Sequence, residues 1–330
     1  MNKDDISGQT HDVLTVNDLS VNFKISLGRV EAVKHAGFSI KSGETLGIVG
    51  ESGSGKSVMS MAIMGLLRRN QTAGVSGEIW FSEKNLLTES EEAMRQIRGN
   101  RITMVFQEPM ISLNPIHTCG RQVTEPLILH KGYSKRDAFD RGVELMDRVG
   151  IPLPERRMRE FPFQLSGGMR QRVMIAMALA CEPMLLIADE PTTALDVTIQ
   201  AQILELMKDL RTRTRTAIMM ITHDLGVIAE MSDRVMVLYA GQVMEIASVR
   251  DLFHSPSHPY TCGLLESIPR VSEEKKALYA IEGTVPNPTH MIAGCVFHPR
   301  CSRAEAICKE QTPELLDLGG GHHTRCIYNE

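Results

Sequence analysis

The 330-residue chain is long enough for one large domain or two modest domains, and its 42% hydrophobic and 23% charged residues are ordinary for a globular protein. The formal net charge of −4 gives no electrostatic basis for binding nucleic acid. Since no apolar run approaches the roughly 20 residues that span a bilayer, and the polar, acidic N-terminus is not a signal peptide, we expect a protein of the cytosol or of the cytosolic face of a membrane.

The first predicted elements surround a glycine-rich run. Residues 1–12 are expected to form a flexible tail, and alternating apolar residues over 14–23 predict a β-strand. A short apolar strand at 45–49 leads into the glycine-rich run at 50–57. Apolar residues of helical length follow at 59–67, so the local order is strand, loop and helix.

The sequence pattern of residues 111–170 differs from that of the flanking segments and predicts a helical insertion. Ser134 is a suitable N-cap, and Gly150 a suitable stop, for an amphipathic helix between them. The apolar residues at helical spacing in this helix are Phe139, Val143, Met146 and Val149. We therefore expect the insertion to interrupt an α/β core.

After the insertion, strands and helices alternate. Apolar strands are predicted at 185–188, 217–222 and 235–239, with a helix face marked by apolar residues over 199–210. This alternation favours a mostly parallel sheet with helices on both sides. From about residue 250 the periodicity fades and Pro, His and Cys become frequent, so we expect a domain boundary there.

The glycine-rich run GESGSGKS fits the pattern of a phosphate-binding loop. Its residues are Gly50, Glu51, Ser52, Gly53, Ser54, Gly55, Lys56 and Ser57. The glycines let backbone N–H groups turn toward phosphates, Lys56 places a positive charge on the β- and γ-phosphates, and Ser57 offers a hydroxyl to Mg²⁺. The helix that begins there adds its N-terminal dipole.

Polar side chains follow three predicted strands. Asp189 and Glu190 end an apolar strand, where one carboxylate can hold Mg²⁺ and the other can polarise an attacking water. Gln107 and His223 each follow another strand. Alone, Asp189 and Glu190 are equally compatible with a pair of solvated acids, while Gln107 and His223 would be interpreted as a surface glutamine and a structural histidine. The functional interpretation of these residues is favoured because open α/β sheets bind ligands at the carboxyl ends of their strands.

A second anion site is predicted where Ser166, Gly167 and Gly168 precede a helical stretch over 169–180. Ser is a good N-cap, glycine permits close approach of a ligand, and the exposed N–H groups favour an anion. The simpler interpretation is a capped helix. One nucleotide rarely needs two such helix starts from one subunit, which favours a site shared between two subunits.

Taken together, these motifs over residues 13–250 resemble the ATP-binding subunit of an ABC transporter. The matching segments are the Walker A loop at 50–57, Gln107 of the Q-loop, the signature at 165–169, Walker B at 185–190, the D-loop at Ala194, Leu195 and Asp196, and the switch histidine His223. The resemblance implies a P-loop NTPase cassette. This is an α/β fold with a mostly parallel sheet, antiparallel N-terminal strands and a helical subdomain inserted at 111–170.

The resemblance also implies residue roles. It assigns catalysis to Glu190, His223, Lys56 and Gln107, and a Mg²⁺ site to Ser57, Gln107 and Asp189. Ser166, Gly167 and Gly168 are expected to contact ATP that the partner holds. Phe23 is nearest in position to the aromatic residue that stacks on adenine, although several extra residues follow it. A core phenylalanine is an equally good interpretation of Phe23.

Three further segments, at 105–115, 187–203 and 254–265, resemble the dipeptide and oligopeptide importers, with residues 251–330 as their C-terminal extension. This subfamily also handles nickel complexes and some antimicrobial peptides. The resemblance implies a second, related ATPase subunit, two transmembrane permease subunits, an extracytoplasmic solute-binding protein, and a place on the cytoplasmic face of the inner membrane.

Four of the seven cysteines crowd into the C-terminal end. They are Cys295, Cys301, Cys308 and Cys326, separated by 5, 6 and 17 residues. Four thiolates can hold an iron–sulfur cluster or a zinc ion. The absence of a C-x-x-C pair weakens a zinc ribbon, and zinc would recruit His298, His322 or His323. Free cysteines are a third interpretation. Resemblance to importer subunits with a 4Fe–4S cluster favours the cluster.

Other functions are weighed against peptide import. A non-transport ABC ATPase of DNA repair or translation usually has two cassettes in one chain or a long coiled-coil insertion, and this sequence has neither. A regulatory module without turnover would not need Asp189, Glu190 and His223 together. Import of a non-peptide solute such as a nickel complex remains an alternative.

Overall fold

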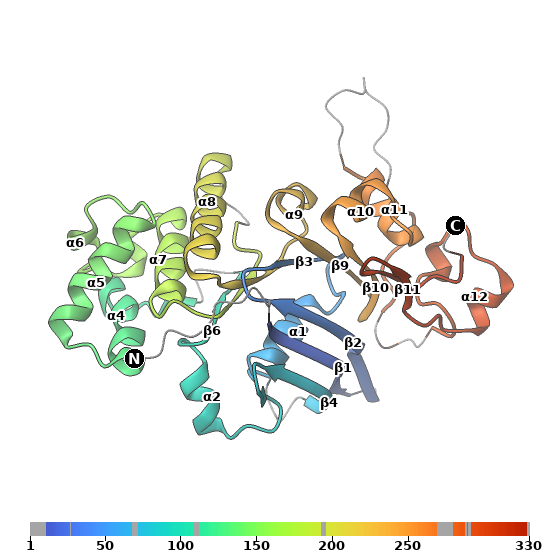
Figure 1. Ribbon diagram of the computed structural model, residues 1–330, viewed down its shortest axis with the longest axis horizontal. Helices are drawn as coiled ribbons and strands as arrows, with labels where there is room; N and C mark the ends of the chain where they lie inside the picture. Colours follow the sequence, from blue (N-terminus) through green and yellow to red (C-terminus); the bar gives the residue numbers. More distant parts are fainter. Residues whose placement is uncertain are drawn as a thin grey trace.

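The computed structural model describes residues 11–26, 28–67, 72–107, 112–192, 196–268, 280–287, 289 and 292–328. The main sheet has eight strands (Figure 1). In chain order they are β3 (Thr45–Val49), β6 (Ile102–Val105), β7 (Leu185–Asp189), β8 (Ala217–Ile221), β9 (Arg234–Tyr239), β10 (Gln242–Ser248), β11 (Leu316–Gly319) and β12 (His322–Thr324).

The spatial order of this sheet is β11-β12-β10-β9-β3-β8-β7-β6. The stretch from β9 to β6 is parallel, which confirms the expected mostly parallel α/β core. Its strands are short and almost entirely buried, since helices or a second sheet cover both faces. Alternate residues of β7 face opposite cores: Leu186 and Ala188 join one, Leu185 and Ile187 the other.

A second, antiparallel sheet covers one face of the main sheet. Its order is β2-β1-β4-β5, with bounds β1 (Asp12–Ile25), β2 (Gly28–Lys41), β4 (Thr72–Phe81) and β5 (Lys84–Asn85). The register of β1 shifts between Val16 and Leu19, where Asp18 has a φ of 51°. Gly77 of β4 faces this bulge, and a Cβ there would lie 2.4 Å from the Asp18 carbonyl oxygen. The predicted N-terminal strand is therefore present, with a bulge in its middle.

The helices of the α/β core are α1 (Lys56–Ile63), α2 (Glu91–Ile97), α8 (Val197–Thr214) and α9 (Leu225–Met231). The sequence predicted a helix over 59–67, but α1 starts earlier and ends earlier. It ends because Gly65 has a φ of 63° and donates its N–H to the Ala62 carbonyl oxygen, which closes the last turn.

The predicted helical insertion is present and lies beside the edge strand β6 (Figure 1). Its elements are α4 (Cys119–Lys131), α5 (Lys135–Arg148), α6 (Pro154–Arg157), the 3₁₀ turn η1 (Pro162–Gln164) and α7 (Gly167–Leu179). As expected, Ser134 caps α5 by accepting the Asp137 N–H at 3.2 Å. A buried cluster that includes Val123, Leu145 and Val173 holds α4, α5 and α7 together.

The C-terminal part begins with α10 (Val249–His254) and α11 (Pro259–Glu266) and continues with η2 (His298–Arg300) and α12 (Ala306–Glu310). Strand β12 pairs with β10, so the end of the chain extends the main sheet. The rings of Tyr239, Tyr260 and Phe297 meet at centroid distances of 4.7 to 5.3 Å and join the C-terminal part to β9. The boundary near residue 250 stays a prediction.

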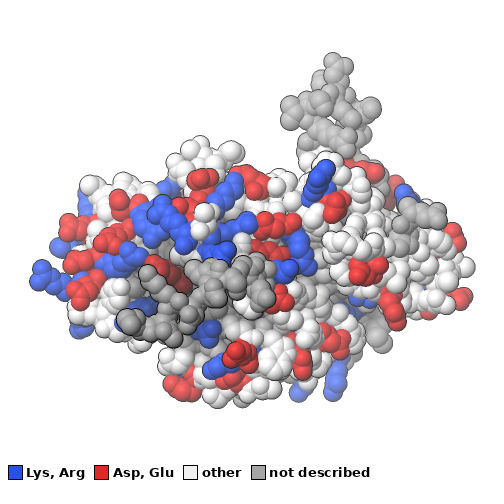
Figure 2. Space-filling model, in the orientation of Figure 1, with Lys and Arg blue, Asp and Glu red and all other residues white. Residues whose placement is uncertain are grey.

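In the described part of the chain, no helix has both the length and the apolar character needed to cross a bilayer. Basic and acidic side chains are interspersed over the face in Figure 2. Lysines and arginines are more frequent there over the helical insertion and α8 than over the C-terminal part.

Candidate functional site

The phosphate-binding loop connects β3 to α1, and two of its glycines could not be replaced without movement of neighbouring backbone. Gly50 and Gly55 have φ values of 152° and 99°. A Cβ on Gly50 would lie 2.1 Å from the Leu238 carbonyl oxygen, and one on Gly55 would lie 2.5 Å from the Ala32 carbonyl oxygen. The loop is therefore wedged between β2 and β9, which fixes its curl.

One pocket of about 370 Å³ lies over this loop. Its lining residues are Ala32, Gly50, Glu51, Ser52, Gly53, Ser54, Gly55, Lys56, Ser57, Val58, Gln107, Glu190 and His223. The last three follow β6, β7 and β8, whose carboxyl ends meet at one edge of the sheet beside β3. The structure thus brings together candidates from four separate segments, while their catalytic roles stay predictions.

Lys56 lies inside the curl of the loop. Its Nζ donates to the carbonyl oxygens of Gly50 at 2.7 Å and Glu51 at 2.9 Å, and to Ser54 Oγ at 3.3 Å. Burial lowers the pKa of Lys56, while the nearby carboxylates of Glu190, Asp189 and Glu51 oppose that shift. The ammonium is therefore held where a phosphate bound by the loop would meet it.

Ser57 lines the pocket, and its hydroxyl is hydrogen-bonded to Asp189, the last residue of β7. Asp189 is only 4% exposed, and burial raises its pKa, partly offset by a hydrogen bond from Ser57. A hydroxyl and a carboxylate are hard oxygen donors, and Mg²⁺ is commonly held by one or two protein oxygens together with substrate phosphates. This pair therefore fits the magnesium ion that an ATP site requires.

Glu190 is held by the other two strand-end residues. Its Oε2 accepts from Gln107 Nε2 at 2.9 Å, and its Oε1 lies 3.3 Å from His223 Nδ1. Its φ of 48° is left-handed, and its N–H donates to the Ile221 carbonyl oxygen at 2.8 Å. Such strained backbone is frequent at functional sites. The amide of Gln107 thus contacts Glu190 here.

The signature residues lie outside this pocket. Ser166 is exposed and caps α7 by accepting the Met169 N–H at 3.3 Å, and Gly167 and Gly168 form its first turn. They therefore do not contact the chain's own nucleotide pocket. Buried Gln171, which sequence reasoning missed, donates from Nε2 to the Pro191 carbonyl oxygen at 2.6 Å and ties α7 to the segment after Glu190.

The structure bears only in part on two other predictions, the stacking of adenine on Phe23 and the D-loop. Phe23 is half-buried in β1 and packs against the core beneath the antiparallel sheet, and it does not line the pocket. Of the D-loop, Ala194 and Leu195 lie outside the described residues, while Asp196 caps α8 by accepting the Ile199 N–H at 2.9 Å. Stacking of adenine on Phe23 stays a prediction.

The four C-terminal cysteines line a single cavity of about 20 Å³, together with His298. They are Cys295, Cys301, Cys308 and Cys326. However, the described residues hold no group of three or more His, Cys, Asp or Glu side chains placed to bind a metal ion. His322 and His323 lie elsewhere, His322 beside Glu245 at 2.8 Å. The structure gathers the thiols without arranging them as a metal centre.

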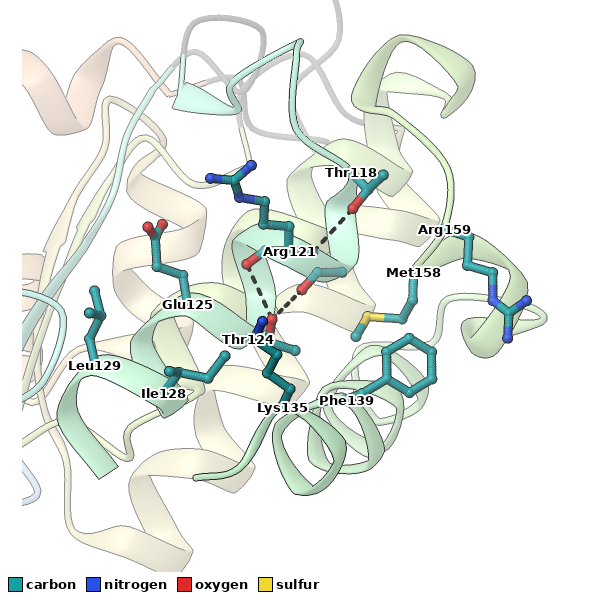
Figure 3. Close-up of a pocket in the computed structure, with 11 residues that line it drawn as sticks. Thr118, Arg121, Thr124, Glu125, Ile128, Leu129, Lys135, Phe139, Met158 and Arg159 are labelled. Atoms are coloured by element: carbon teal, nitrogen blue, oxygen red, sulfur yellow. Dashed lines mark hydrogen bonds between the residues drawn. The ribbon is translucent and has the colours of Figure 1, made fainter. Parts of the chain in front are cut away.

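A larger open pocket of about 690 Å³ lies on the helical insertion (Figure 3). Side chains of α4 supply most of its lining, with Phe139 from α5 and Met158 and Arg159 from the end of α6. Ile128 and Leu129 are 37% and 69% exposed. An exposed apolar surface rimmed by polar residues marks a site of interaction with another protein.

Two family models match the sequence. "ABC transporter" matches residues 33–193, and "Oligopeptide/dipeptide transporter, C-terminal region" matches residues 244–308. The chain is 52% identical over 318 residues to the oligopeptide transport ATP-binding protein AppD of Bacillus subtilis, covering 96% of this chain and 97% of AppD. It is 49% identical over 319 residues to OppD of Escherichia coli, covering 97% and 94%.

Among solved structures, the dimeric post-hydrolysis state of the ATP-binding cassette MJ0796 with ADP and Pi superposes with a TM-score of 0.65. It is 31% identical, and the match covers 72% of this chain and 99% of that cassette. The cassette CbiO1 of Clostridium perfringens superposes with a TM-score of 0.61 at 28% identity, covering 75% and 92%.

Proposed function

The chain belongs to the ABC transporter family, among the ATP-binding subunits of oligopeptide and dipeptide transporters, and we propose that it hydrolyses ATP to power import of di- and oligopeptides across the cytoplasmic membrane. The observation that carries this proposal is the single pocket where the phosphate-binding loop meets Gln107, Glu190 and His223. Peptides are the proposed cargo because relatives of near-equal length are named for oligopeptide transport.

We propose the following roles for the residues of this pocket. The loop N–H groups and Lys56 hold the phosphates, and Ser57 and Asp189 hold Mg²⁺, which neutralises phosphate charge when bound. Glu190 polarises the attacking water, and its hydrogen bond from Gln107 fixes the orientation of the carboxylate. His223 reaches the γ-phosphate from the end of the neighbouring strand β8 and stabilises the charge that develops there.

We also propose that a second ATPase subunit, related but not identical, completes the site. Ser166, Gly167 and Gly168 lie outside their own pocket but expose the N-terminus of α7. That helix start suits a phosphate held by a partner. The two subunits then hydrolyse ATP efficiently only when they close together, so the isolated chain should turn over slowly.

The membrane partners are proposed to contact the helical insertion. Its open pocket offers exposed Ile128 and Leu129 beside charged Arg121, Glu125 and Lys135, which suits a cytoplasmic helix of a permease subunit. Two permease subunits would anchor the chain peripherally on the cytoplasmic face of the inner membrane. A solute-binding protein outside the membrane would deliver the peptide.

We propose that the cassette spans residues 13–250 and that the C-terminal extension spans residues 251–330. In this extension we propose a 4Fe–4S cluster rather than zinc. The support is the four thiols around one cavity, although their present arrangement is not that of a metal centre. The cluster would close a part with little core of its own. Protein purified without oxygen should be brown and contain about four iron atoms per chain. A colourless protein with stoichiometric zinc would contradict this.

Purification of the tagged chain from membranes in mild detergent tests the main proposal. We expect two permease subunits and a second ATPase subunit to co-purify. In vesicles, ATP hydrolysis by this complex should rise when peptide-loaded binding protein is added. Absence of membrane subunits, or stimulation by nickel complexes and not by peptides, would contradict peptide import.

A further inference from the structure

A buried arginine of the C-terminal extension reaches the phosphate-binding loop. Arg300 lies at the end of η2, and its side chain is only 6% exposed. Its Nη1 donates to both carboxylate oxygens of Glu51, at 2.9 Å and 3.1 Å. Its Nε donates to the Glu282 carbonyl oxygen at 2.9 Å and its Nη2 to the Ile281 carbonyl oxygen at 3.2 Å. The guanidinium is therefore fixed by the extension itself.

Two tyrosines complete this contact. The guanidinium lies 5.7 Å from the centre of the Tyr239 ring, and Nη1 is 3.4 Å from its hydroxyl oxygen. The Tyr260 hydroxyl accepts the backbone N–H of Glu51 at 3.0 Å. Thus Arg300 and Tyr260, both beyond residue 250, hold the side chain and the backbone of the same loop residue.

The position of Glu51 explains why such a contact matters. Glu51 lines the nucleotide pocket, and its backbone carbonyl also accepts from Lys56. A carboxylate in a loop that binds phosphates repels them, and partial burial strengthens that repulsion. A buried arginine on both carboxylate oxygens draws the charge away from the phosphates and neutralises it.

We propose that Arg300 is a positioning residue of the ATP site, which neutralises Glu51 and holds the phosphate-binding loop in its binding conformation. The C-terminal extension then sets nucleotide affinity together with the cassette. The inference rests on the proposed function, because it treats the pocket as an ATP site. Arg300 acts through Glu51 and does not itself contact the phosphates.

The test measures Mg·ATP affinity of the purified full-length chain, using fluorescent ATP, for four proteins: wild type, Arg300→Met, Glu51→Gln and the double variant. We expect Arg300→Met to weaken binding about tenfold or more, because it leaves Glu51 unpaired. The double variant should bind within about threefold of Glu51→Gln, because the uncompensated carboxylate is gone. In the assembled transporter, Arg300→Met should raise KM more than it lowers kcat.

Arg250→Met is the matched control, since Arg250 is exposed on α10 and does not line the nucleotide pocket. It should bind like wild type. If Arg300→Met does not fold, Arg300→Gln with and without Glu51→Gln gives the same comparison, because glutamine is polar but carries no charge to neutralise Glu51. Wild-type affinity in the Arg300 variants, or weak binding that Glu51→Gln does not restore, would overturn the inference. A wild-type chain that binds no ATP would instead count against the proposed function.

Discussion

At the scale of single residues, both the backbone and the side chain of Glu190 are held in place by neighbouring residues of the site. Its backbone is left-handed, and its carboxylate contacts side chains from two neighbouring strand ends. A left-handed backbone persists only when surrounding contacts hold it. Here they include the hydrogen bond from the Glu190 N–H to the Ile221 carbonyl oxygen. These contacts therefore fix the orientation of the carboxylate that we propose as the group that polarises water.

Replacement of Glu190 by glutamine tests this role. The amide keeps the size of the side chain but cannot act as a base, so ATPase turnover of the assembled transporter should fall by about 10²-fold or more while ATP binding is retained. Steady-state ATPase and nucleotide-binding assays check both halves. Glu205→Gln, exposed on α8, is the control. Wild-type turnover in the Glu190 variant would remove that residue from its proposed role.

The loop glycines offer a second test at this scale. Alanine at Gly55 would place a Cβ 2.5 Å from the Ala32 carbonyl oxygen, whereas alanine at Gly53 would meet no atom within 4 Å. Both have positive φ, so Gly53→Ala should cost only about 1–2 kcal/mol of strain. Gly55→Ala should be less stable in urea unfolding and should lose ATP binding. Equal effects of the two substitutions would show that the wedge against β2 is unimportant.

At the scale of elements, the short apolar strands could be predicted because buried parallel strands leave an apolar run with turn signals around it. The strands β11 and β12 could not, since residues such as His322 and His323 carry no strand pattern and are held by pairing with β10. The site residues at the strand ends could be predicted from their motifs, because the carboxyl ends of parallel strands meet at one edge of the sheet. Arg300, Tyr260 and Gln171 were missed because only tertiary contacts bring them to it.

Glu245 tests how β10 organises the C-terminal part. It is fully buried, and its carboxylate accepts the N–H groups of Ser257 and His258 at 2.8 Å and 2.9 Å and contacts His322 at 2.8 Å. Glu245→Ala leaves buried donors unpaired and should lower the free energy of unfolding by about 2–4 kcal/mol. Glu245→Gln should cost less, because it keeps an acceptor. Urea unfolding of both variants measures this, and a neutral alanine variant would contradict it.

At the scale of the whole molecule, the signature at 165–169 and the Walker B segment at 185–190 are close in sequence but lie at different places on the structure. Glu190, which follows β7, lines the pocket of its own chain, while Ser166 is exposed at the start of α7 and does not line that pocket. Buried Gln171 connects the two through Pro191. Movement of the insertion against a partner would therefore reach the segment that holds Glu190.

The most direct test of this shared-site account is Ser166→Arg, compared with Lys56→Ala. Since Ser166 lies outside its own pocket, the isolated Ser166→Arg chain should bind Mg·ATP with wild-type affinity, whereas Lys56→Ala should not bind it. In the assembled transporter, Ser166→Arg should abolish the hydrolysis at the site that the partner subunit holds. Loss of ATP binding by the isolated Ser166→Arg chain, or full hydrolysis at the partner's site, would contradict the account.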